Sequence, residues 1–308
     1  MEDVNTTSFK KIYETKDIVF INYYKSCFYF DNKEYFFKVN DNQGAILEGE
    51  LLATKIGEKL GIDVLHVEPA VFVDKSGNEK VGLLSKNFFK DRLSVYFDAK
   101  ASAEVKKMTY NGIINGVKEF IHRSNKLQPE LNIDLESNFY TKLRDMIFFD
   151  FLTFQGDRFL RNIDFFMKKN KTCDGWTLCL APIFDNSWIF CFQEHISGFL
   201  PLKPIVSDYI SRRHYFITGF KAYQGYDEMK NDVLKYFYRN TRMKKLAVKA
   251  YNIDIEECIA EIEKEYPGYI FAPEYKQSAI DCWNFTKQTL KIDFGVENLI
   301  KESDDFEK

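Results

Sequence analysis

The sequence lacks paired cysteines and an excess of basic charge. Its six cysteines are scattered over 308 residues without a CxxC pair, so the spacing of a metal site is absent and a disulfide framework is not expected in a chain of this length. Reduced, mostly buried thiols are the expected state. The 43 Lys and Arg residues face 46 Asp and Glu, a net charge of -3. Direct nucleic-acid binding normally leaves a basic footprint, and we expect none.

Long apolar runs are missing as well. The first residues, MEDVNTTSFKK, contain no apolar segment of the kind that signal peptides carry, and no run approaches 18 uninterrupted apolar residues. We therefore expect a soluble, cytoplasmic protein that makes no use of a membrane. Delivery into another cell as an effector stays open.

The composition that remains is that of a folded protein, with 45% hydrophobic and 29% charged residues. A chain of this length exceeds one ordinary hydrophobic core and suits two lobes. Its first part predicts mainly strands, because β-branched and aromatic residues recur within 17–39, 67–74 and 80–88. Between them, apolar residues at helical spacing predict a helix over 45–62.

After Phe88 the pattern becomes mostly helical. A strand hairpin over 163–185 is the exception, and a helical remainder begins at about residue 208. We therefore expect an α+β protein with two domains, 1–88 and 89–308. The further predicted features are helices over 103–122 and 135–154, the second capped by Ser137 or Asn138, and a frayed tail over 301–308.

The segment FQGDRFLRNIDFF, residues 154–166, places charged side chains between apolar runs. Asp157 and Asn162 have the D-x-x-x-x-N spacing of a kinase catalytic loop. The hairpin that follows ends at Asp185, so these three side chains are expected to meet at one end of it. Phosphoryl transfer needs this set, because one carboxylate accepts the proton of the attacking hydroxyl while the other and the amide oxygen hold Mg²⁺.

Two upstream residues strengthen this interpretation. Lys38 closes the predicted strand EYFFKV, and Glu50 lies on the helix that follows. A kinase needs a lysine on a strand for the ATP phosphates and a glutamate on the next helix to hold that lysine. Each residue alone also suits a solvent-exposed position. The ordered set of Lys38, Glu50, Asp157, Asn162 and Asp185 is what makes coincidence improbable.

With these motifs the chain resembles the HipA-type serine/threonine kinases, in particular compact, CtkA-like members. The matching segments are FFDFLTFQGDRFLRNIDFF, LAPIFDNS and the helix from Glu50-Leu51-Leu52-Ala53 to Leu60-Gly61, and the resemblance covers about residues 17–190. It implies a two-lobed protein-kinase-like fold, with a small antiparallel sheet and one helix in the N-lobe and a larger, mostly helical C-lobe.

The resemblance also implies roles for single residues. Asp157 would be the catalytic base, Asn162 and Asp185 the Mg²⁺ ligands, and Lys38 the contact to the ATP phosphates, with Glu50 as its ion-pair partner. Further implied contacts are a phosphate loop at Lys25 and Ser26, and adenine hydrogen bonds from the backbone around Lys86 and Phe88.

Two departures from the family stand out. Phe159 takes the place of the family's His after Asp-Arg, and the turn Asn22 to Ser26 contains no glycine, so the Gly-rich loop of ordinary protein kinases is missing. The family generally lacks that loop too. The details of phosphate binding are therefore less well defined by the sequence than the fold is.

The leading hypothesis is an ATP- and Mg²⁺-dependent kinase that phosphorylates a protein Ser or Thr and also itself. Alternatives are a pseudokinase or nucleotide-binding scaffold, a small-molecule phosphotransferase, and a protein in which Asp157 and Arg158 are structural turn residues. The sequence identifies neither the protein substrate nor an antitoxin-like partner. Toxin, effector and housekeeping roles are equally compatible with it.

Overall fold

The computed structural model describes residues 9–13, 35–39, 45–88, 93–95, 110–155, 158, 163–170, 174–186, 189–190, 216–218, 221–223 and 226–306. The chain divides into two compact units. The first unit comprises Met1–Asn87, Asp185–Leu202 and Leu246–Lys308, and the second comprises Phe88–Phe184 and Lys203–Lys245. The division into domains 1–88 and 89–308 stays a prediction.

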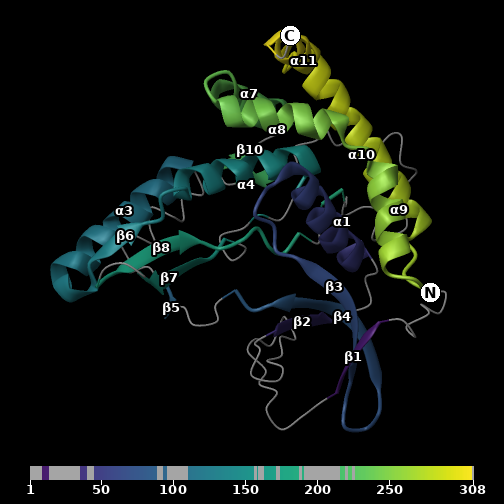
Figure 1. Ribbon diagram of the computed structural model, residues 1–308, viewed down its shortest axis with the longest axis horizontal. Coiled ribbons are helices and arrows are strands. Elements are labelled where there is room, and N and C mark those ends of the chain that lie inside the picture. The colour runs from purple at the N-terminus through teal and green to yellow at the C-terminus, as the bar shows by residue number, and fades with distance from the viewer. Residues whose placement is uncertain are drawn as a thin grey trace. The chain divides into compact units, whose positions relative to one another are not determined.

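The first unit contains a four-stranded sheet in the order β1-β3-β4-β2 (Figure 1). β1 pairs with β3 in parallel, and the other pairs are antiparallel. The sheet thus agrees with the small antiparallel sheet expected of the N-terminal part, except for the parallel pair β1–β3. Its strands are β1 (Lys10–Tyr13), β2 (Tyr35–Val39), β3 (Val67–Val73) and β4 (Glu79–Lys86).

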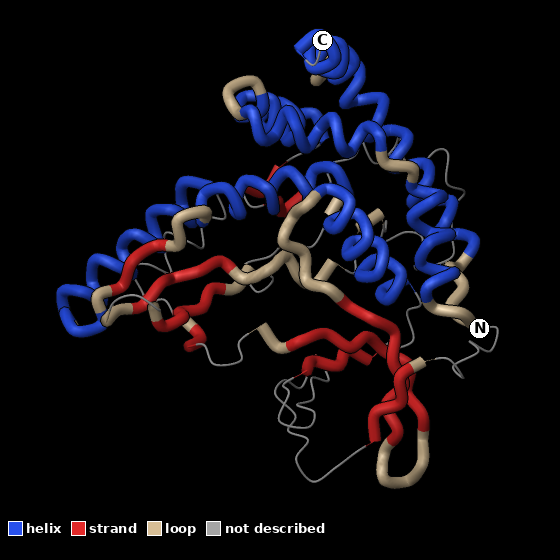
Figure 2. The backbone as a smooth tube through the Cα atoms, viewed as in Figure 1, coloured by secondary structure: helices blue, strands red, loops and turns tan. Residues whose placement is uncertain are grey.

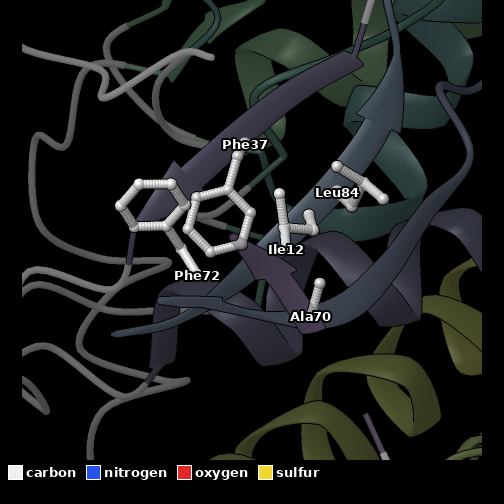
Figure 3. Packing of buried hydrophobic residues seen from close by; sticks show 5 residues of the cluster. All are labelled: Ile12, Phe37, Ala70, Phe72 and Leu84. Atoms are coloured by element: carbon white, nitrogen blue, oxygen red, sulfur yellow. The ribbon is translucent and has the colours of Figure 1, made fainter. Parts of the chain in front are cut away.

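One face of this sheet carries a hydrophobic cluster to which all four strands contribute (Figure 3). Side chains two residues apart on a strand point to the same face, which explains why Ala70 and Phe72 of β3 both belong to it. Phe37 and Phe72 lie with their ring centroids 5.9 Å apart. The members of the cluster are Ile12, Phe37, Ala70, Phe72 and Leu84.

Helix α1 (Ala45–Leu60) confirms the predicted helix, and it packs on β3 and on α9 (Ile255–Glu265). The helix ends at Gly61, whose φ of 72° is the left-handed conformation that glycine adopts easily. Two lysines of α1 form ion pairs with α9. Lys59 Nζ lies 2.8 Å from Glu261 Oε1, and Lys55 Nζ lies 3.1 Å from Glu265 Oε2.

The remaining helices of the first unit come from the C-terminal part of the chain. They are α10 (Pro273–Ile292), α11 (Val296–Phe306) and the second half of α8 (Thr241–Asn252). Asp254 caps α9 by accepting hydrogen bonds from the backbone N–H groups of Glu256 and Glu257. The helical remainder predicted from about residue 208 is confirmed over 226–306, but two short strands over Phe216–Thr218 and Lys221–Tyr223 precede these helices. Residues 301–306 of the tail continue α11.

The second unit is built on a four-stranded sheet in the order β5-β7-β8-β6, along which helices α3 and α4 run (Figure 2). The predicted hairpin is confirmed as the antiparallel pair β7–β8. The elements of this unit are β5 (Leu93–Ser94), α3 (Tyr110–Leu127), η2 (Pro129–Leu131), β6 (Ile133–Leu135), α4 (Phe139–Thr153), β7 (Phe165–Lys169), β8 (Trp176–Leu180), β9 (Phe216–Thr218), β10 (Lys221–Tyr223) and α7 (Tyr226–Phe237).

Some predicted elements differ from those observed. The helix expected over 135–154 begins at Phe139, because Ile133–Leu135 pairs with β8 as strand β6. Asn138 is its N-cap position but makes no side-chain cap hydrogen bond. The helix expected over 103–122 runs instead from Tyr110 to Leu127 within the described residues. The strands expected over 17–30 lie outside the described residues.

Three cysteines of the described part, Cys179, Cys258 and Cys282, are buried free thiols, as expected. A search of the described helices for a stretch both long and apolar enough to span a bilayer finds none.

Candidate functional site

Lys38 forms the centre of an ion-pair cluster in the first unit. The residue lies on β2 opposite Leu83 of β4. Its Nζ donates hydrogen bonds to Glu50 Oε1 at 2.8 Å and to Asp185 Oδ1 at 2.7 Å. The side chains of Lys38, Glu50 and Asp185 expose only 25%, 6% and 11% of their surface. Water therefore screens these ion pairs only weakly, and each charge is stabilised mainly by the opposite charge beside it.

The surroundings of Lys38 act on its pKa in opposite directions. Burial lowers the pKa, but the attraction of Glu50 and Asp185 and their hydrogen bonds outweigh it, so the pKa of Lys38 is raised. Lys38 is thus a fixed cation at neutral pH. A permanent positive charge between two carboxylates is suited to exchange one of them for an incoming anion.

Glu50 reaches Lys38 from α1, in its first half. The residue is 5% exposed, as expected of a side chain turned away from water. The next turn of the helix supports it, since Thr54 Oγ1 donates a hydrogen bond to the Glu50 carbonyl oxygen at 3.1 Å. Apolar residues on the same helix are buried beside it, which fixes its rotation about the helix axis. These residues are Leu47, Leu51, Leu52 and Ile56.

Asp185 lies just beyond β8 in the sequence, after the short bridge at Ile183. Its backbone has a φ of 57°, the left-handed region that non-glycine residues seldom adopt. The next residue, Asn186, is 1% exposed, and its carbonyl oxygen accepts a hydrogen bond from Ile189 N at 3.2 Å. The residue that follows Asp185 is thus buried and hydrogen-bonded through its backbone.

Arg158 and Asp150 form a second ion pair, within the second unit. Both side chains are completely buried, and Arg158 Nη2 lies 3.0 Å from Asp150 Oδ1. Sequence reasoning assigned neither residue a role beyond helix packing or a turn. A signal was present, because an acid in the apolar run FFDFL must find a charged partner once the helix is buried.

Four of the predicted site residues, Lys25, Ser26, Asp157 and Asn162, lie outside the described residues. Of the two positions assigned to adenine, Lys86 is the exposed last residue of β4.

The second of those positions, Phe88, packs against Phe184 with ring centroids 5.5 Å apart. Of the predicted site residues, the structure brings Lys38, Glu50 and Asp185 into contact. The functional roles of all these residues stay predictions.

The donor atoms suit the cofactors that the sequence implies. Asp185 offers carboxylate oxygens, the ligand type that Mg²⁺ prefers, and Lys38 offers an ammonium group for phosphate oxygens. Among the described residues no group of three or more His, Cys, Asp or Glu side chains is placed to hold a metal by itself. A Mg²⁺ ion at Asp185 would therefore need ligands from Asn162, water or the nucleotide phosphates.

Neither the protein-family models nor the curated proteins contain a match to this sequence. Among solved structures, the chain is similar to the Helicobacter pylori proinflammatory kinase CtkA, with 18% identity and a TM-score of 0.57 over 90% of this chain and 95% of that chain.

A second similar structure is HipA of the Shewanella oneidensis MR-1 toxin–antitoxin system, solved with HipB and operator DNA. It shares 14% identity at a TM-score of 0.46, over 92% of this chain and 67% of that chain, a likeness too loose to add to the fold assignment. The similarity to CtkA shows that this chain shares the fold of that kinase, which agrees at the level of the fold with the resemblance drawn from the motifs.

Proposed function

We propose that this protein is an ATP- and Mg²⁺-dependent kinase that transfers the γ-phosphate of ATP to a Ser or Thr hydroxyl of a protein, itself included. The observation that carries the proposal is the contact of Lys38 with both Glu50 and Asp185. These are three of the five residues that the catalytic motifs predict. They come from a strand, a helix and a turn that are far apart in the chain.

Within this proposal Lys38 holds the nucleotide phosphates. Glu50 keeps the ammonium group of Lys38 in place, because Glu50 is only 5% exposed and few water molecules can compete for its carboxylate. In the nucleotide complex Lys38 would contact phosphate oxygens in place of Asp185, and Asp185 and Asn162 would hold Mg²⁺.

Asp157 is the residue that we assign to the acceptor hydroxyl. A carboxylate in this role orients the hydroxyl and takes its proton during transfer. Bound Mg²⁺ supplies neutralisation of the charge on the phosphate oxygens. The protein's own contribution is to fix the positions of the reacting groups and to present fixed charges to them.

Autophosphorylation with labelled ATP tests the proposal directly. The wild-type protein incorporates label in the presence of Mg²⁺, and Asp157→Ala abolishes the incorporation. Asp134→Ala is the matched control, because Asp134 is an exposed carboxylate on strand β6. Label incorporation by the Asp157→Ala protein at the wild-type rate would remove Asp157 from its role.

A pseudokinase or nucleotide-binding scaffold is distinguished by ligand-induced stabilisation. A ligand that binds only the native state at 100 times its Kd stabilises by about 2.7 kcal/mol. We expect ATP to raise the melting temperature of the wild-type protein only when Mg²⁺ is present. In the Asp185→Asn protein, the melting temperature measured with ATP should no longer depend on Mg²⁺. Stabilisation by ATP that is indifferent to Mg²⁺, without label transfer, would favour the scaffold.

A further inference from the structure

The buried guanidinium of Arg158 donates hydrogen bonds to Asp150 and Phe184 in the described part of the chain. Toward Asp150, Nε lies 3.1 Å from Oδ2 and Nη2 lies 3.0 Å from Oδ1. Nη1 instead donates a hydrogen bond of 2.6 Å to the carbonyl oxygen of Phe184. The planar fork of an arginine is needed for this arrangement, because a lysine ammonium cannot span two partners in the same geometry.

Phe184 is held at a second point. Its ring packs against Phe88 at 5.5 Å between centroids, so both its carbonyl group and its side chain are fixed. The next residue in the chain is Asp185, whose φ of 57° is uncommon for a residue with a side chain. Such a conformation persists where the surrounding contacts determine it, and the carbonyl oxygen of Phe184 belongs to the peptide that leads into it.

We propose that Arg158 is a positioning residue: clamped by Asp150, it fixes the Phe184 carbonyl and so the backbone turn that presents the Asp185 carboxylate to Lys38. The expected effect on phosphoryl transfer rests on the proposed function. The expected effect on the contact between Lys38 and Asp185 holds whether or not the protein is a kinase.

A purely structural role for the ion pair makes a different prediction. A buried pair of charges is often replaceable by apolar residues of similar volume without loss of stability. If Asp150 and Arg158 served packing alone, the double substitution Asp150→Leu with Arg158→Met would restore a fully competent protein. If Arg158 positions Phe184, the same variant folds but loses the anchored turn.

The chain offers a matched control on the same helix. Asp145 of α4 accepts two hydrogen bonds of 2.9 Å from Arg242 Nε, one at each carboxylate oxygen. The pair resembles Asp150–Arg158 in chemistry but links α4 to α8, with the Arg242 side chain 47% exposed. Asp145→Leu with Arg242→Met therefore removes an Asp–Arg pair from the same helix and leaves the hydrogen bond of Arg158 to Phe184 in place.

Chemical labelling of Lys38 is the direct readout. An amine-reactive ester must reach the amine that it acylates, and Lys38 Nζ is engaged by Glu50 and Asp185 in a side chain that is only 25% exposed. Loss of the contact with Asp185 leaves this amine more open to the reagent, so the acylation of Lys38, measured by mass spectrometry at pH 8, should become faster. We expect a several-fold faster rate in the Asp150–Arg158 double variant, as in Asp185→Asn, and no change in the Asp145–Arg242 variant.

Arg158→Lys is the second variant and keeps a positive charge beside Asp150. We expect this variant to fold and to show the same faster acylation, because the hydrogen bond to Phe184 is lost with the guanidinium fork. Thermal unfolding of each protein verifies its fold before labelling. Wild-type acylation rates at Lys38 in both folded Arg158 variants would overturn the proposal.

Kinetics separate this inference from the proposed function. In an active kinase, Arg158→Lys lowers kcat at least tenfold and raises the Mg²⁺ concentration needed for half-maximal rate, with little change in KM for the protein substrate. Arg242→Lys leaves all three unchanged. A wild-type protein without transfer activity would refute the proposed function alone, because the labelling of Lys38 needs no turnover.

Discussion

The ammonium nitrogen of Lys38 lies 2.7 Å from Oδ1 of Asp185, although 147 positions separate the two residues in the chain. Glu50, on α1, contacts the same nitrogen at 2.8 Å. A lysine held between two carboxylates in this way keeps its charge and its direction. The predictions that follow concern the groups that hold this cluster and the helix from which Glu50 projects.

Glu50→Gln tests the support of Lys38. A hydrogen bond to a charged group contributes about 1.5–3 kcal/mol, so we expect the rate of phosphoryl transfer to fall by about 10- to 100-fold. The fold should survive, because Gln retains an oxygen that can accept from Lys38. Steady-state autophosphorylation measures the effect. Glu58→Gln, an exposed position on the same helix, serves as the control and should leave the rate unchanged.

Gly82→Ala tests the spacing between β4 and the strand that carries Lys38. A Cβ at this position would lie 2.4 Å from the Lys38 carbonyl oxygen and 2.6 Å from Phe37 Cζ. Strand β2 must therefore move, and we expect a loss of about 1–3 kcal/mol in the free energy of unfolding together with a lower rate of transfer.

The control for this substitution is Gly77→Ala. Nothing lies within 4 Å of its Cβ position, but its φ of 83° strains a side chain. This variant should lose stability by about 1–2 kcal/mol without losing activity. Equal activity in both folded proteins would show that β2 accommodates the added methyl group.

Glu48 predicts a pH dependence of stability. The side chain is 4% exposed; one oxygen accepts a hydrogen bond from Ala272 N at 2.8 Å, and the other has no partner among the described residues. Burial raises its pKa to about 7, with Glu274 adding to the shift and the hydrogen bond from Ala272 opposing it. The folded protein therefore binds a proton that the unfolded chain has released above pH 4.5.

The sign of the effect follows from this proton. Stability is fully present below the ordinary pKa of Glu and falls as pH rises toward 7. Glu48→Gln, which cannot ionise, should remove that slope and be more stable than the wild type at pH 8, by at most about 3 kcal/mol. Urea unfolding at pH 5 and pH 8 measures it, with Glu58→Gln as control. An unchanged slope would show that Glu48 does not titrate in this range.

Lys59 and Glu261 test how strongly α1 is tied to α9. The pair is partly exposed, at 28% and 39% of the side chains, so we expect a coupling energy of only about 0.2–1 kcal/mol. A double-mutant cycle with Lys59→Met and Glu261→Gln, followed by chemical denaturation, measures it at low and high salt. A coupling of zero at low salt would mean that other contacts hold the two helices together.

Much of this architecture was predictable from the sequence. The period of Leu47, Leu51 and Ile56 predicts α1, because it reflects one buried face. The β-branched and aromatic residues of VEPAVFV predict β3. The convergence of Lys38, Glu50 and Asp185 was predictable only through the order of the motifs. Local patterns do not encode contacts between residues so far apart.

Other features left no local signal. Strand β1, KKIY, is too short to show alternation and is defined by its parallel pairing with β3. Only residues 136–138 separate strand β6 from α4, and the helical prediction from the sequence began at Leu135, inside the strand. The hydrogen bond from Arg158 Nη1 goes to the backbone carbonyl of Phe184, and any residue at position 184 would supply the same acceptor.

The link between α1 and α9 bears on how the protein is made. Lys59 and Glu261 are 202 positions apart, and Lys249 Nζ donates to the Leu60 carbonyl oxygen at the end of α1. Contacts of such long range form late, since the intervening chain must be gathered first. When the ribosome has synthesised α1, β3 and β4 but not yet α9, the side of α1 that contacts α9 is uncovered. A chaperone would bind the nascent chain at this side of α1.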